Sequence, residues 1–180
     1  MRRSDLEHLI RAAGRIADEH ELVIIGSQAI LGQFPDAPAA LLRSMEADLY
    51  PMSRPEMADK VDGAIGEGSK FHQTHGYFAQ GVGPDTATLP KGWRKRLIRI
   101  ENQNTRGYVG LCLEVHDLAI SKYIAGREKD REFTRELARH GMTDQNMLFE
   151  RLAVTKLDPA VLKLVTNRIK KDFPQPPHKR

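Results

Sequence analysis

Two short segments of the chain carry residue types suited to phosphate chemistry. The first is Gly26-Ser27, which follows the apolar residues 22–25 and precedes a short helix predicted over residues 27–32. Glycine lets the backbone approach a phosphate group closely, while the serine hydroxyl and the free amides of a helix start donate hydrogen bonds to its oxygens. The junction therefore predicts a phosphate site. The alternative interpretation is an ordinary turn after a buried strand.

The second segment contains Glu46 and Asp48. Residues 45–50 alternate between apolar and polar side chains, so they predict a strand in which these two acids point to the same side. Two carboxylates on one face are suited to a hard divalent cation, Mg²⁺ or Mn²⁺, which would bridge phosphate oxygens during nucleotidyl transfer. The alternative is the solvated face of an edge strand.

These segments resemble a known signature. Residues 23–27, Val-Ile-Ile-Gly-Ser, and residues 43–49, Arg-Ser-Met-Glu-Ala-Asp-Leu, look like the motifs of the polymerase-beta-type nucleotidyltransferase superfamily, where a Gly-Ser or Gly-Gly turn precedes an acidic-x-Asp pair. The Arg-Ser before the acids and the intervening length are closest to the AbiEii-type toxin branch and its uncharacterised relatives. Residues 118–130 are similar to the helical Lys...Ala-x-Arg-x-Lys-Asp segment of that branch.

The resemblance implies a nucleoside triphosphate as substrate and a role for each matching residue. It assigns catalysis to Glu46, Asp48 and Lys122, nucleotide binding to Gly26, Ser27, Arg43, Ser44 and Asp130, and metal binding to Glu46 and Asp48. Family members often use a third metal carboxylate on a later strand, and Glu101 is the candidate here. Its alternative is an ordinary strand-end carboxylate. Glutamate stands at position 46 where the branch usually has aspartate, which lengthens the reach to the metal by a methylene.

The resemblance also implies an acceptor and a biological setting. The acceptor would be a hydroxyl of RNA or protein, and the setting a toxin-antitoxin or phage-defence system with a cognate antitoxin as partner. A second hypothesis is a catalytically degenerate nucleotidyltransferase fold that binds nucleotide, RNA or a partner protein without turnover. A third is an antitoxin-like interaction protein whose binding needs no metal.

Other reactive residue types have weaker functional interpretations. Lys122 either lines a cleft or only extends its ammonium group from an apolar helix stripe to solvent. His72 and His75 lack cysteine partners, so we expect loop histidines rather than zinc ligands. Cys112 lies between two leucines and predicts a buried, unreactive thiol. Trp93, among five nearby basic residues, either stacks on single-stranded RNA or, as we prefer, anchors a loop in the core.

The elements that would position these residues follow from the apolar pattern. The capping-box spacing of Ser4 and Glu7 predicts a helix that continues to residue 17. Helix is also predicted over residues 55–65, whereas residues 66–76 are predicted to be irregular. From residue 116 to about 173 the pattern is helical, with interruptions near Gly126, Gly141 and Pro159. Strands are predicted at residues 22–25, 45–50, 77–82, 96–101 and 108–115.

These elements predict an α+β fold, in which a small mixed β-sheet of nucleotidyltransferase type lies between an N-terminal helix and a C-terminal helical half. We expect one domain over residues 1–173, with a helix-plus-sheet core at 1–115 and a helical half at 116–173. Prolines, together with Lys179 and Arg180, predict a flexible basic tail over residues 174–180.

Composition excludes several classes of protein. The 180 residues include 28 Lys+Arg and 24 Asp+Glu, and the hydrophobic fraction of 40% is ordinary for a globular domain. One cysteine excludes an internal disulfide, and no run approaches the roughly 20 apolar residues of a membrane span, so we expect a cytoplasmic protein. Residues 1–90 carry a net charge of −5 and residues 91–180 one of +9. This asymmetry suits an acidic metal region facing a basic phosphate-binding surface, or else solvated helix faces.

Overall fold

Five short strands form one mixed sheet in the computed structural model, which describes residues 1–174. The strands are β1 (Glu21–Ile24), β2 (Glu46–Pro51), β3 (Phe78–Gly81), β4 (Ile98–Ile100) and β5 (Val109–Cys112), in the spatial order β3-β2-β1-β5-β4. β1 is parallel to β5 and antiparallel to β2, β3 is parallel to β2, and β4 is antiparallel to β5. The sheet and its flanking helices confirm the predicted α+β fold.

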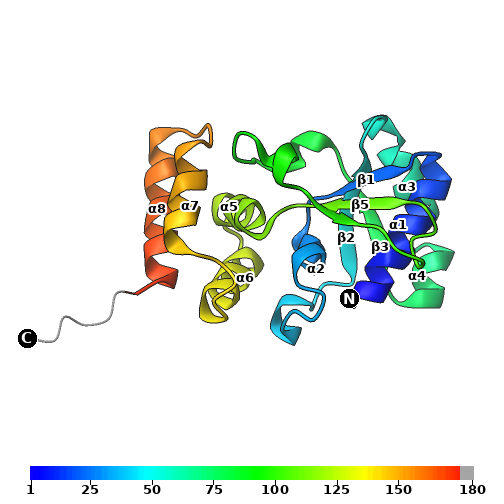
Figure 1. The fold of residues 1–180 in the computed structure, drawn as a ribbon, viewed down its shortest axis with the longest axis horizontal. Coiled ribbons are helices and arrows are strands. Elements are labelled where there is room, and N and C mark those ends of the chain that lie inside the picture. Colours follow the sequence, from blue (N-terminus) through cyan, green and yellow to red (C-terminus); the bar gives the residue numbers. More distant parts are fainter. Residues whose placement is uncertain (175–180) are drawn as a thin grey trace, which may run out of the picture.

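Four helices pack around the sheet. α1 (Arg3–Ala17) lies against α3 (Ala58–Ile65) and against β1, β2 and β5, and α4 (Lys70–His75) follows α3. α2 (Ile30–Gln33) packs against β4 and β5. Short 3₁₀ turns connect these elements: η1 (Ser27–Ala29), η2 (Ala39–Leu41), η3 (Pro55–Met57), η4 (Pro84–Thr86) and η5 (Trp93–Arg96). In Figure 1 the sheet, α1 and α3 lie together at the right.

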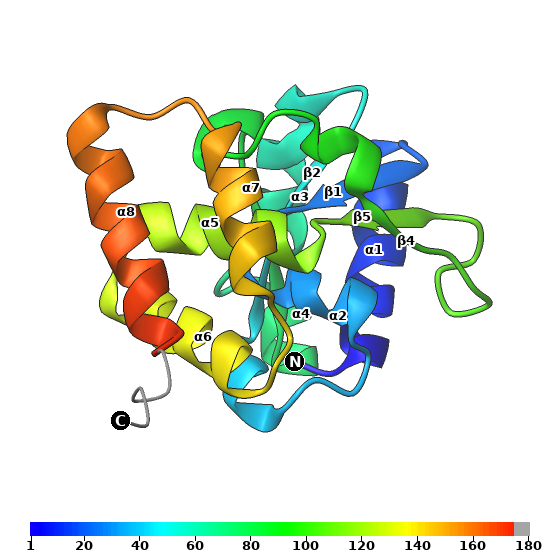
Figure 2. The ribbon, with the colours of Figure 1, turned by 60° about the vertical axis from the view of Figure 1, so that its left-hand side comes forward.

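The C-terminal half is helical. It contains α5 (Val115–Ala125), α6 (Glu128–Arg139), α7 (Gln145–Ala153) and α8 (Pro159–Asp172). α5 packs against α6, α7 and α8. Figure 1 shows α7 and α8 at the end of the molecule away from the sheet, and α8 is at the far left in Figure 2 as well. Buried residues from both halves belong to one core cluster, and α5 and α6 pack onto the N-terminal half through η1, α2 and η2.

The predicted interruptions of the C-terminal helices are confirmed. Gly126 and Gly141 both have a φ of 62°, a left-handed conformation that glycine adopts without steric cost and that ends α5 and α6. Pro159 opens α8, where its missing amide removes no helical hydrogen bond.

The predicted N-terminus of the first helix was wrong by two residues. α1 begins at Arg3, and Asp5, not Ser4, is the capping side chain, because its carboxylate accepts the backbone N–H of Arg2 at 2.8 Å. Glu7 instead accepts hydrogen bonds from Arg3 at 2.9 Å and from Asn102 at 2.8 Å. Glu7, which the sequence predicted as the capping acid, therefore fixes the loop after β4 instead.

Residues 66–76 are not irregular throughout. α4 begins after Ser69, whose hydroxyl accepts the N–H of His72 at 3.1 Å, and ends at Gly76, where φ is 75°. The cap and the terminal glycine were present in the sequence, but the helix between them is too polar to show an apolar period. The strand predicted at 96–101 was also too long, because Arg96 belongs to η5 and only residues 98–100 join the sheet.

Among residues 1–174, no helix combines the length and the apolar character that crossing a membrane requires. Of the predicted basic tail, residues 175–180 lie outside the described residues.

Candidate active site

The topology of the sheet brings the two predicted segments together. Because β2 is antiparallel to β1, its first residues lie beside the residues that follow β1, and the N–H of Ile25 donates to the carbonyl oxygen of Asp48 at 3.0 Å. Gly26 has an ordinary φ of −79°, so no unusual dihedral requires glycine there. A Cβ atom at Gly26 would instead collide with the Asp48 carboxylate. Glycine is required by this close approach.

The carboxyl groups of Glu46 and Asp48 lie on the same face of β2 and line one cleft, as predicted. Burial, together with the neighbouring carboxyl group of Asp48 and its charge, raises the pKa of Glu46. Two carboxyl groups that face one cleft side by side offer the oxygen donors that a hard divalent cation prefers.

Ser44 positions the start of β2. Its hydroxyl oxygen accepts the backbone N–H of Glu46 and donates to the Glu46 carbonyl oxygen, both at 3.1 Å. Ser44 lines the cleft as expected, but its hydroxyl is engaged in holding Glu46. Arg43, beside it, forms an ion pair of 3.6 Å with Glu132 of α6, and both side chains are more than half exposed.

Lys122, Arg127 and Asp130 form a charged group at the turn between α5 and α6. The Lys122 ammonium lies 3.5 Å from Asp130, and the guanidinium Nε of Arg127 donates to the same carboxylate at 2.7 Å. Asp130 is 1% exposed, so it lies beneath the cleft rather than on its surface. The prediction that Asp130 contacts nucleotide is therefore corrected: the structure shows a residue that orients two cations.

Burial and neighbouring charges act in opposite directions within this group. Burial opposes ionisation of Asp130, but the hydrogen bond from Arg127 and the charge of Lys122 hold its pKa below the usual range. Burial lowers the pKa of Lys122, and this effect is opposed by Asp130 and Asp48. The charges of Asp48 and Glu46 both act on Arg127. The cations thus lie within electrostatic reach of the paired acids.

Together these residues surround a cleft of about 620 Å³ between the sheet and α6. Six of the predicted residues line it: Ser27, Arg43, Ser44, Glu46, Asp48 and Lys122. Sequence reasoning missed other lining residues, including Thr86, Arg127, Lys129, Glu132, Phe133, Arg135 and Glu136. Arg127 and Lys129 lie inside the motif at residues 118–130, which was the available signal for them.

Glu101 does not belong to this cleft. β4 runs antiparallel to β5, so its C-terminal end lies level with the start of β1, at the opposite end of the strands from Gly26. There Glu101 pairs with Arg99 at 2.9 Å, and Arg99 also contacts Glu21, the first residue of β1. The prediction of Glu101 as a third metal ligand is corrected by this strand direction.

Three other side chains with a predicted role, Cys112, Trp93 and His75, do not line the cleft. Cys112 is fully buried, and burial raises its pKa to about 12, which confirms an unreactive thiol. Trp93 packs against the core while Arg94 lies over its ring, which supports the core anchor. His75 packs among aromatic rings at α4. Within the described part of the chain, no group of three or more His, Cys, Asp and Glu side chains is arranged to hold a metal.

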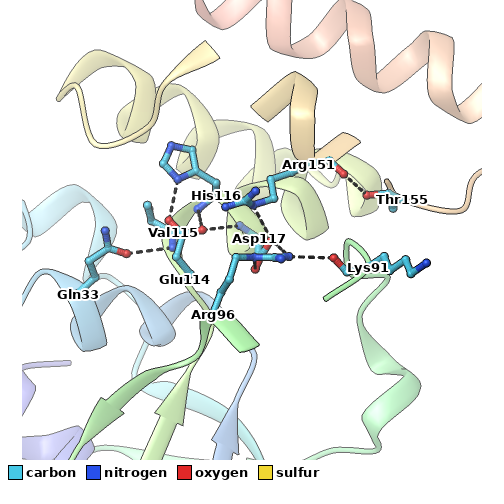
Figure 3. A network of polar contacts seen from close by, with 9 residues as sticks. All are labelled: Gln33, Lys91, Arg96, Glu114, Val115, His116, Asp117, Arg151 and Thr155. Carbon is cyan, nitrogen blue, oxygen red and sulfur yellow. Dashed lines mark hydrogen bonds and ion pairs between the residues drawn. The ribbon is translucent and has the colours of Figure 1, made fainter. Parts of the chain in front are cut away.

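A polar network fixes the start of α5 (Figure 3). Asp117 is fully buried and accepts two hydrogen bonds from Arg96, at 2.8 and 2.9 Å, while Arg151 of α7 lies 3.3 Å away. Glu114 caps α5 by accepting the N–H of His116 at 3.1 Å. The helix that carries Lys122 is therefore anchored to both η5 and α7.

A mixed sheet in which a Gly-Ser turn faces an acid-x-acid strand, beside a lysine-bearing helix, defines a nucleotidyltransferase type of fold and site. Residues 4–171 match the family model described as "Nucleotidyltransferase of unknown function (DUF6036)", and the chain belongs to this family. No curated protein and no solved structure matches the chain. The description of the family supports nucleotidyltransferase activity but names no substrate.

Proposed function

We propose that the protein is a divalent-cation-dependent nucleotidyltransferase that moves a nucleoside monophosphate from a nucleoside triphosphate to a hydroxyl of RNA or protein. The observation that carries the proposal is the pair of carboxyl groups of Glu46 and Asp48, held side by side next to Gly26 in a cleft lined by Ser27 and Lys122. Mg²⁺ or Mn²⁺ fits this donor set because both acids offer oxygen atoms and repel each other without a cation.

In the proposed reaction, the acceptor oxygen forms a bond to the α-phosphorus of the nucleotide. The bond from that phosphorus to the oxygen shared with the β-phosphate breaks, pyrophosphate leaves with the electron pair, and the acceptor proton is lost to solvent. Glu46 and Asp48 would hold a divalent cation, which when bound neutralises charge on the phosphoryl group. Lys122, Arg127 and Lys129 would bind the phosphates, and the Ser27 hydroxyl would donate to one of their oxygens.

The resemblance to AbiEii-type toxins supports a finer assignment. We propose a toxin or phage-defence component whose partner is a cognate antitoxin. Expression of the wild-type protein should then arrest growth, whereas expression of Asp48→Asn at the same level should not. Arrest that is equal for both proteins would exclude nucleotidyl transfer as the toxic activity.

The direct test of the reaction uses nucleotide labelled in the γ-phosphate, total cellular RNA as acceptor, and pyrophosphate release as the readout. Wild-type protein with magnesium should release labelled pyrophosphate, and omission of magnesium or the Asp48→Ala change should abolish release. If the wild-type and variant proteins behave alike, the enzyme assignment fails. Release without acceptor RNA would direct the search to a protein acceptor, including the protein itself.

A catalytically degenerate protein that binds nucleotide, RNA or a partner is the second candidate. It is favoured by the small number of metal acids, since Glu46 and Asp48 remain after Glu101 is removed from the site. A ligand that binds the native state raises the melting temperature. A magnesium-dependent rise with a nucleoside triphosphate, combined with no pyrophosphate release on RNA or protein acceptors, would identify this candidate.

A further inference from the structure

The carboxylates of the cleft are unequally available to metal ions. Glu46 and Asp48 face the cleft together, whereas Glu132 pairs with Arg43 across it. Glu136 lies 3.5 Å from Arg139 and 3.4 Å from His140. Asp130 is buried and holds Lys122 and Arg127. Within residues 1–174 the donor set beside Gly26 is therefore a single pair of acids.

A single pair of acids is too few for two cations. In two-metal sites the ions lie about 3.5–4 Å apart and act on the attacking and the leaving oxygen together. Each such ion prefers about six oxygen ligands, and shared carboxylates are needed to offset the repulsion between the ions. Glu46 and Asp48 supply enough charge for one.

Fixed positive charge lines the same cleft as the two acids. Lys122 is buried and Arg127 is bound through its Nε to Asp130 at 2.7 Å, so both groups are held in place before a ligand arrives. Lys122 lies within electrostatic reach of Asp48, and Arg127 within reach of Asp48 and Glu46. Preorganised charges of this kind stabilise a transition state without reorganising during the reaction.

We infer that this site takes one divalent cation with the nucleotide, and that Lys122 and Arg127, positioned by Asp130, supply the charge that a second cation supplies in two-metal transferases. The inference rests on the proposed function, because it concerns the same cleft and the same substrate. It makes Lys122 and Arg127 phosphate-binding residues and Asp130 a positioning residue.

The experiment counts bound ions rather than turnover. Wild-type protein is saturated with a nucleoside triphosphate whose α–β bridge is a methylene group, and Mn²⁺ is titrated while free Mn²⁺ is measured by electron paramagnetic resonance. We expect one bound ion per chain. Two bound ions would overturn the inference but leave the proposed function standing. Failure of the wild-type protein to bind the analogue with Mn²⁺ would instead overturn the proposed function, and the inference with it.

Variants test the role of the fixed cations. Lys122→Met should weaken analogue binding by at least tenfold while the count stays at one ion, and Asp130→Asn should weaken it less because both cations remain. Lys163→Met, at an exposed position on α8, is the matched control and should bind as wild type does. Circular dichroism checks that each variant is folded. Unchanged affinity in folded Lys122→Met would overturn the assignment of charge to Lys122.

Discussion

The carboxylate of Asp48 lies against the α-carbon of Gly26, with no room for a side chain between them. The turn that we propose binds phosphate and the strand that we propose binds metal are thus in direct contact, although 22 positions separate Gly26 from Asp48 in the sequence. Any group larger than hydrogen at position 26 must displace the acid.

Gly26→Ala should therefore disable the site. The added methyl group overlaps Asp48, so we expect a loss of stability of about 1–3 kcal/mol from overpacking and a loss of Mn²⁺ binding of more than tenfold. Denaturant unfolding and Mn²⁺ titration measure the two effects. Gly63→Ala is the control, because Gly63 lies in α3 with nothing within 4 Å of an added Cβ. That change should stabilise the protein by about 0.5–1 kcal/mol. Wild-type Mn²⁺ binding in Gly26→Ala would contradict the proposed contact.

The raised pKa of Glu46 predicts a pH-dependent stability. The native protein holds the proton of this carboxyl at a higher pH than the unfolded chain does, so its favourable contribution is complete below the unfolded pKa. That contribution is lost as the pH rises through the raised native pKa. Glu46→Gln cannot ionise, so its melting temperature should fall less than that of wild type between pH 4 and pH 8. Added Mg²⁺ should recover the loss in wild type only. Parallel melting curves with pH would contradict the mutual repulsion of the two acids.

Asp130→Ala should be far more damaging than the conservative change to asparagine. Removing this carboxylate leaves the buried ammonium of Lys122 without its partner, and breaking a buried pair on one side costs about 3–5 kcal/mol. Denaturant unfolding of Asp130→Ala, Asp130→Asn and wild type should rank their stabilities in that ascending order. A loss below about 1 kcal/mol for Asp130→Ala would mean that Lys122 is solvated rather than held by Asp130.

Asp117 provides a contrast between stability and binding. Its carboxylate is fully buried between Arg96 and Arg151 and does not line the cleft. Asp117→Ala should lower stability by about 3–5 kcal/mol because two cations lose their partner. Below its lowered melting temperature the variant should still bind Mn²⁺ with wild-type stoichiometry. A folded variant that no longer binds Mn²⁺ would show that the network also positions Glu46 and Asp48.

Glu101→Ala tests whether Glu101 is correctly left out of the proposed metal ligands. Its carboxylate is half exposed and pairs with Arg99 at the edge of the sheet away from Gly26. An exposed ion pair of this kind contributes about 0–1 kcal/mol, so stability and Mn²⁺ affinity should both be close to wild type. A tenfold fall in Mn²⁺ affinity would restore Glu101 as a ligand.

The sequence was most informative where local chemistry decides the structure. The apolar run at residues 22–25 and the alternation at 45–50 gave β1 and the acid-bearing face of β2, and Gly126, Gly141 and Pro159 marked the helix ends. These features depend on neighbours in the chain, since glycine and proline act through their own dihedrals.

Features that depend on strand order and on turns were less predictable. Glu101 seemed a third ligand because sequence shows that it ends a strand but not in which direction that strand runs. The sequence predicted Asp130 as a nucleotide contact, but the turn at Gly126 places its carboxylate against the ammonium group of Lys122. Arg127 was likewise visible in the motif, but its role follows only from the two-residue connection between α5 and α6.

Buried apolar residues and cleft-facing acids alternate along β2, so the core and the proposed ion site depend on the same strand register. Ala47 and Leu49 are fully buried, and the residues between and before them, Asp48 and Glu46, face the cleft. A slip of one position in the pairing with β1 would turn Ala47 outward and drive both acids into the apolar interior. A chain that mispaired these strands would thus lose the proposed ion site and its core in the same error, so misfolded molecules should bind no Mn²⁺.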